Sequence, residues 1–203
     1  MNKSDLEIKN GRVIKYTGYA KSVTIPDGVT SIGYCAFSNG KNLKKINIPN
    51  SVTYVASGAF IYCENLKSKQ ANYKAVTIQK DCTLWCKGYK FLPNEWSKEE
   101  NPILCKRGYH YCTNLFDIFN YYSGRLNEDI AIFECEVGDI VLQSDNNSKC
   151  CTNTIKLVHR LSNEKIIELL NTNSRDSEIS ISKIITTILA CSLLCGLVLG
   201  YSC

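Results

Sequence analysis

The sequence lacks the short motifs by which many enzyme classes are recognised. It has no H-E-x-x-H zinc motif, no G-x-x-x-x-G-K phosphate loop, no G-x-G-x-x-G dinucleotide turn and no G-x-S-x-G nucleophile elbow. Each absence removes the sequence evidence for one reaction class. We therefore expect binding rather than catalysis, and the sequence assigns neither a catalytic residue nor a cofactor.

A secretion signal is also missing from the start of the chain. Residues 1–7 contain no apolar core that could act as a signal peptide. Disulfides belong mainly to oxidising compartments, so we expect the twelve cysteines to be reduced thiols in a chain that stays in the cytosol.

Charge is absent from the last 20 residues, 184–203, of which 14 are apolar. A helix of that length would rise about 30 Å, the thickness of the hydrocarbon core of a bilayer. The sequence predicts a transmembrane helix here, joined by a polar linker at 172–183 to a bulk that stays cytosolic. The alternative is a soluble cytoplasmic chain whose final helix packs on protein.

Within this tail Ser192, Gly196 and Gly200 recur every four residues. Small residues at that spacing let two membrane helices approach closely. A homodimer through Gly196 and Gly200 is therefore possible.

One pattern is present twice, at a spacing of 23 residues. Each copy needs a neighbour to bury its apolar side, as in repeat proteins with periods of this length. The predicted repeat core is Val23, Ile25, Phe37, Leu43, Ile46, Ile48, Phe60 and Leu66.

Each copy begins with a short strand of alternating side chains. Apolar residues point inward, so the intervening residues point outward and form a candidate binding face. Pro26 and Pro49 then end the strands, because proline has no N–H to donate. The predicted face consists of Ser22, Thr24, Lys45 and Asn47.

The segments TIPDGVTSIGYCAF and NIPNSVTYVASGAF resemble the BspA-like leucine-rich repeats of surface antigens, over residues 11–68. The resemblance implies a short solenoid. Its register ends at Lys69, and about three repeats are normally needed for stability. We therefore expect a repeat region over 1–70, frayed at residues 1–9, whose open end is capped by the region that follows.

Residues 71–171 are expected to form that cap, a small α+β domain. Residues rich in β-branched and aromatic side chains predict strands, and an apolar stripe predicts a helix beginning near Asn114 and another near Ser162. The predicted strands cover 73–78, 83–92, 103–112, 130–137, 140–143 and 154–159. The fold class expected for the chain is α+β.

Three segments of this region, in order CKGY, CKRGYHYC and NYY, resemble an uncharacterised domain of phage and bacterial proteins, over residues 72–170. That resemblance implies a domain boundary but no reaction.

Cysteine and histidine come closest to a chemical site. Thiolate and imidazole are the usual zinc ligands, but structural sites normally show paired C-x2-4-C knuckles, which are missing here. We therefore predict no metal site, and keep as weak candidates Cys86, Cys105, His110 and Cys112.

The order of Gly108 to Thr113, a helix and a following strand is similar to the nicotinamide-binding part of ADP-ribosyltransferases, with Lys87-Gly88 near the first-strand motif of that family. The family's catalytic carboxylate should lie on a late strand, yet residues 154–159 contain none. An enzyme-derived domain over 72–170 is the alternative function. A cleft joining Lys87, Tyr109 and His110 to a carboxylate such as Glu134 or Glu136 would favour it.

The preferred function is non-enzymatic: recognition of a protein partner by the repeat face, held at a membrane by the C-terminal helix. The net charge of +5 does not by itself indicate nucleic acid, because lysines such as Lys41 and Lys44 fall in solvated loops between repeats. Nucleic acid is therefore an unlikely partner.

Overall fold

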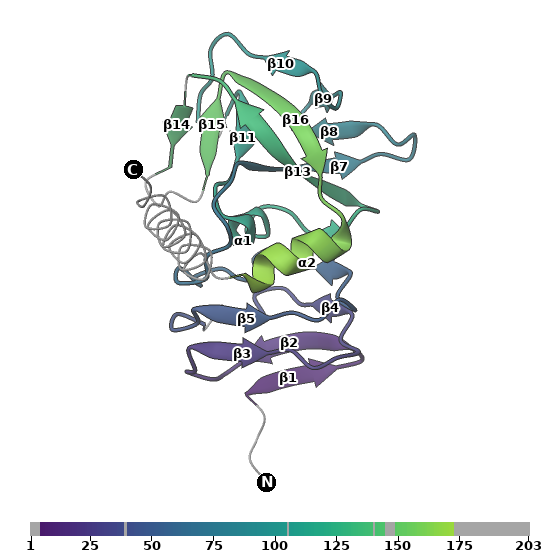
Figure 1. Cartoon of the computed structure of the whole chain (residues 1–203), viewed down its shortest axis with the longest axis vertical. Coiled ribbons are helices and arrows are strands. Elements are labelled where there is room, and N and C mark those ends of the chain that lie inside the picture. The colour runs from purple at the N-terminus through teal and green to yellow at the C-terminus, as the bar shows by residue number, and fades with distance from the viewer. Residues whose placement is uncertain (1–4, 39, 105, 140, 145–148, 173–203) are drawn as a thin grey trace, which may run out of the picture.

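The computed structural model describes residues 5–38, 40–104, 106–139, 141–144 and 149–172. Within these residues the protein consists mostly of short strands with two helices, and is of the α+β class. Figure 1 shows the N-terminal strands stacked at one end, a larger strand-rich region at the other, and helix α2 between them.

The N-terminal strands pair across equivalent positions of the two repeats. β3 (Ser22–Thr24) lies parallel to β5 (Lys45–Asn47), with Val23 opposite Ile46. A second parallel row consists of β2 (Arg12–Tyr16), β4 (Ser31–Ile32) and β6 (Tyr54–Val55). The 23-residue period of the sequence is the register of the pairs β3–β5 and β4–β6.

Each repeat turns sharply just before its buried phenylalanine. Cys35 and Gly58 occupy equivalent positions, and both have left-handed backbones, with φ of 51° and 67°. Glycine adopts this conformation without steric cost, whereas a residue with a Cβ does not. Both repeats therefore have the same left-handed turn, although the first repeat has Cys35 where the second has Gly58.

The repeat interior is a column of aromatic rings. Tyr16, Phe37 and Phe60 lie one above another, with centroid distances of 5.7 Å and 5.6 Å between neighbours. All residues of the predicted repeat core are buried except Val23, which is partly exposed.

The N-terminal residues differ from the expectation that 1–9 are frayed. β1 (Leu6–Lys9) pairs antiparallel with β2 and adds an edge strand to the second row. Leu6 and Ile8 pack against the repeat core, which supplies the apolar contact that orders them. The prediction was wrong for residues 6–9.

The second region is built from two antiparallel sheets. The larger has the order β10-β16-β13-β7-β8-β9, and the smaller the order β11-β15-β14. The strands of the larger sheet are β7 (Tyr73–Ile78), β8 (Leu84–Cys86), β9 (Tyr89–Phe91), β10 (Trp96–Lys98), β13 (Ile130–Val137) and β16 (Thr154–Arg160). Those of the smaller sheet are β11 (Tyr109–Tyr111), β14 (Val141–Gln143) and β15 (Cys150–Thr152).

Two predicted strands of this region are wrong in extent. Residues 83–92 form not one strand but the hairpin β8–β9, because Lys87 and Gly88 both have positive φ and reverse the chain. Of the residues described within 103–112, only Tyr109–Tyr111 form a strand. Ile103 and Arg107 instead close a small loop through a backbone hydrogen bond.

The two described helices are short. α1 (Leu115–Ile118) follows Asn114, and α2 (Asn163–Asn171) begins at Ser162, whose hydroxyl accepts a hydrogen bond from the backbone N–H of Lys165. Such a bond satisfies an N–H that the first helical turn leaves unpaired.

The second region covers the open end of the repeats. β12 (Gly124–Arg125) pairs antiparallel with β6 and continues the second row. The Phe60 ring meets Phe116 and Phe119 edge-on, at centroid distances of 5.1 Å and 6.1 Å. One buried cluster therefore runs from the repeats into the helices.

Two asparagine side chains complete this junction. The Asn171 amide accepts a hydrogen bond from the N–H of Ile48 and donates one to its C=O, at 2.7 Å and 2.9 Å. Asn114 accepts from the N–H of Ser68 and donates to the C=O of Leu66. Each amide occupies backbone groups that a further repeat would otherwise pair.

The predicted C-terminal helix at 184–203 and the linker from residue 173 lie outside the described residues. Among those that are described, neither helix has the length and apolar character needed to cross a membrane.

The aromatic column yields a stability prediction. Phe60→Ala should lower the free energy of unfolding by about 3–5 kcal/mol, because it removes a buried ring that joins both regions. Lys44→Ala, a change at an exposed loop position, should alter it by no more than about 0.5 kcal/mol. Urea denaturation of the full chains measures both. Equal effects would show that the repeat register is misassigned.

Candidate functional site

The strands β3 and β5 present the face predicted to bind a partner. Ser22 and Thr24 are exposed, and Lys45 and Asn47 are partly exposed. The Asn47 amide donates a hydrogen bond to the Thr24 hydroxyl at 2.9 Å, which links the two repeats across the face. The face is therefore polar and held in one arrangement.

A second exposed surface of the repeats is aromatic, and the sequence analysis did not predict it. Tyr34 is 73% exposed and Tyr62 is 62% exposed. A hydrogen bond with Cys35 raises the pKa of the Tyr34 phenol, and the charge of the nearby Tyr62 phenol adds to the shift. Tyr34 and Tyr62 do not belong to the repeated apolar positions that point inward. The sequence could therefore have indicated that they are exposed.

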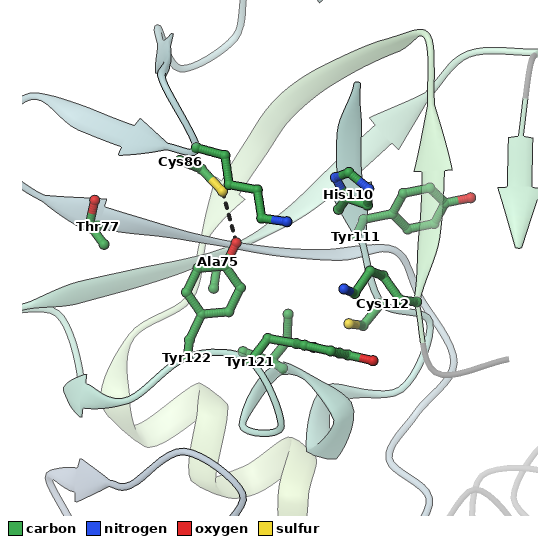
Figure 2. A pocket seen from close by; sticks show the side chains of 11 residues that line it. Ala75, Thr77, Cys86, His110, Tyr111, Cys112, Tyr121 and Tyr122 are labelled. Atoms are coloured by element: carbon green, nitrogen blue, oxygen red, sulfur yellow. Dashed lines mark hydrogen bonds between the residues drawn. The ribbon is translucent and has the colours of Figure 1, made fainter. Parts of the chain in front are cut away.

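The second region contains a cavity of about 320 Å³, here named the tyrosine cavity (Figure 2). It lies beside β7 and β11 and is closed by the β8–β9 turn and the segment after α1. Its aromatic walls are His110, Tyr111, Tyr121 and Tyr122. These four residues come from β11 and the segment after α1, and the sequence analysis did not predict that they meet Ala75 and Thr77 of β7.

One wall of the tyrosine cavity is backed by a buried cation. Lys74 is 1% exposed, and its ammonium donates hydrogen bonds to the Cys86 sulfur at 3.0 Å and the Tyr122 hydroxyl at 3.2 Å. Those two side chains are themselves 2.8 Å apart, as the dashed line in Figure 2 shows. Burial, with the neighbouring thiol, raises the pKa of the Tyr122 phenol.

The pKa of His110 is lowered by burial and by the positive charges around this site. Burial lowers its pKa to about 4, and the positive charges of Lys87, Lys149 and Lys74 act in the same direction. The ammonium of Lys149 also lies 4.0 Å from the centre of the Tyr121 ring, within the range of cation–π attraction. Three lysines thus place positive potential on the tyrosine cavity.

The weak zinc candidates come partly together. Cys86, His110 and Cys112 all line the tyrosine cavity, while Cys105 lies outside the described residues. In the part of the chain that the structure describes, no three His, Cys, Asp or Glu side chains are grouped closely enough to hold a metal. The eight cysteines of that part are free thiols.

The transferase alternative finds no support in this geometry. Lys87 and His110 reach the tyrosine cavity, but no carboxylate is among its described lining residues. Tyr109 instead packs on Tyr89 and donates its hydroxyl to the backbone of Lys98. The described residues therefore do not bring a carboxylate together with Lys87 and His110 in this cavity.

A wider groove of about 800 Å³ runs between the end of the repeats and α1. Phe60, Tyr62 and Asp117 are among its lining residues. Burial raises the pKa of Asp117 to about 6, although the charge of Lys67 opposes this shift.

His110 and Asp117 should affect stability in opposite directions as the pH falls. Between about pH 6.5 and 4 the unfolded chain protonates its histidine while buried His110 stays neutral, so stability falls. Between about pH 6 and 4 folded Asp117 takes up a proton that the unfolded carboxylate does not, so stability rises.

Because of His110, the free energy of unfolding should fall by up to about 3 kcal/mol between pH 7 and pH 4, and we predict that His110→Gln abolishes this fall. Because of Asp117, the free energy of unfolding should rise over the same range, and we predict that Asp117→Asn abolishes this rise. Urea denaturation at pH 7, 5.5 and 4 measures both. Identical pH profiles for the two variants and the unchanged chain would contradict the assignments.

Comparison with protein families finds two matches, which overlap at residues 71–92. Residues 11–92 match the BspA type leucine rich repeat region, and residues 71–169 match a domain of unknown function, DUF7666. The repeat match extends past β6 into β7, β8 and β9, where the described strands are antiparallel. Searches of curated proteins and of solved structures found no significant match. Residues 11–92 are therefore similar to BspA type leucine rich repeats, and residues 71–169 are similar to the DUF7666 domain.

Proposed function

We propose that this chain is a non-enzymatic recognition protein whose repeats form a short solenoid and bind a protein partner through β3 and β5. The observation that carries the proposal is the outward row of Ser22, Thr24, Lys45 and Asn47 on two paired strands. Repeat proteins commonly bind partners on the extended surface that such strands form.

The arrangement of the repeats supports this choice of face. β1 lies at one edge of the second row and β12 at its other edge, while α2 covers the end of the β3–β5 pair through Asn171. Within the described residues, Ser22 and Thr24 of this face are exposed, and Lys45 and Asn47 are partly exposed. The bond between Asn47 and Thr24 lowers the entropy cost of binding, because these side chains are already ordered.

Substitutions on the face test the proposal. The full chain carrying Thr24→Arg and Asn47→Arg should lose capture of a specific protein from a cell lysate, because two long cations would occupy the centre of the interface. Asn101→Arg with Gln143→Arg is the matched control, since it adds the same charge at exposed positions of the second region. Pull-down with quantitative mass spectrometry provides the comparison.

The exposed Tyr34 and Tyr62 are the alternative binding site that the same experiment tests. Tyrosine is frequent among the residues that dominate binding energy at interfaces. Loss of capture with Tyr34→Ala and Tyr62→Ala, but not with the face variant, would move the binding site away from β3 and β5. Capture of nucleic acid by all variants would contradict the choice of a protein as partner.

We further propose that residues 184–203 anchor the chain in a membrane, with the bulk on the cytosolic side and a possible homodimer through Gly196 and Gly200. The support is the sequence alone: 20 uncharged residues follow Lys183. Such a segment is long enough to cross the hydrocarbon core.

Fractionation tests the anchor. After a carbonate wash the full chain should stay with membranes, while a chain ending at Ser182 should be soluble, because only the former retains the apolar segment. Recovery of the full chain as a monodisperse soluble species without detergent would contradict the proposal.

A further inference from the structure

The tyrosine cavity combines positive charge with aromatic walls. Lys87 and Lys149 line it, and no Asp or Glu is among the described residues that do so. Its volume of about 320 Å³ is at the lower end of the roughly 300–1,000 Å³ typical of small-molecule sites. The site therefore suits a small ligand that carries negative charge.

Lys87 occupies a backbone position that lysine does not favour. β8 and β9 are joined by the two residues Lys87 and Gly88, with φ of 49° and 83°. Hairpin turns with two positive φ values favour Asn-Gly, because asparagine tolerates this conformation better than longer side chains do. Lysine here costs stability and places a cation beside the cavity, and strain of this kind is often kept for function.

Lys74 adds a buried charge behind the same cavity. Within the described residues its ammonium contacts a thiol and a phenol but no carboxylate. A buried cation without an opposite charge is costly, and an anion nearby reduces that cost. Both contacts, Cys86 and Tyr122, are walls of the tyrosine cavity, so the charge of Lys74 adds to the positive potential that a ligand there would meet.

We propose that the tyrosine cavity binds a small aromatic carboxylate. Its carboxylate would lie toward Lys87 and Lys149 at the opening, in a charge-assisted contact. Its ring would lie beside Tyr121 and Tyr122 (Figure 2), because aromatic side chains favour edge or offset contacts with another ring. Burial is the main cause of the low pKa of His110, and the charges of the same three lysines lower it further.

Binding of 2-naphthoate and its uncharged analogue 2-naphthamide to the full chain tests the proposal. The two probes have nearly the same shape and differ in charge. Isothermal titration calorimetry at pH 7 should show the amide binding about tenfold more weakly than the carboxylate, because it lacks the ionic contact.

Lys87→Asn separates a ligand role from a structural one. It should weaken naphthoate binding about tenfold and leave naphthamide binding unchanged, while the melting temperature stays equal or rises, because asparagine suits the turn better. Lys44→Asn removes the same charge from an exposed repeat loop and should alter neither affinity.

Several results would overturn the proposal. These are no naphthoate binding at millimolar concentration, equal binding of the two probes, or equal effects of the two lysine variants. Displacement of naphthoate by inorganic phosphate at equal concentration would also overturn it, and would indicate a phosphate ligand instead. A lower melting temperature for Lys87→Asn would contradict the strained-turn argument.

Discussion

The contact on which the rest of the structure depends is that between Phe60 and the rings of Phe116 and Phe119. Two repeats bury only one inter-repeat layer, so the outer side of the second repeat would expose an apolar surface. Phe116 of α1 and Phe119, the residue that follows this helix, supply the missing layer. The Tyr16–Phe37–Phe60 column therefore continues into the second region, and the buried cluster is shared between the regions.

Apolar cover alone would leave backbone groups unpaired at this junction, and such groups are costly when buried. At this junction asparagine side chains pair these groups, because an amide has both N–H donors and a C=O acceptor, as the backbone does. Asn171 pairs both groups of Ile48, and Asn114 pairs the N–H of Ser68 and the C=O of Leu66. Pairing by the Asn171 side chain also occupies the N–H and C=O of Ile48, next to β5, which another strand could otherwise join.

Sequence reasoning succeeded where a local pattern carries the structure. The 23-residue register and the strands 73–78 and 130–137 are confirmed, because alternation and burial are visible in neighbouring residues. It failed where the cause is tertiary. β1 is ordered by contacts of Leu6 and Ile8 with the core, and the β8–β9 turn uses lysine where a turn residue is usual. For the tyrosine cavity the sequence grouped only Cys86, Lys87, His110 and Cys112, because the remaining walls join these residues only after separate segments have folded.

The same short segment serves both halves of the molecule. Phe116 and Phe119 of α1 and its C-terminal end pack on the repeats, whereas Ile118, Tyr121 and Tyr122 line the tyrosine cavity. The backbone C=O of Phe119 also accepts a hydrogen bond from Gly58 in the second repeat. A shift of α1 toward one side would therefore open contacts on the other. The order of the cavity thus depends on the repeats, although no repeat residue is among its described walls.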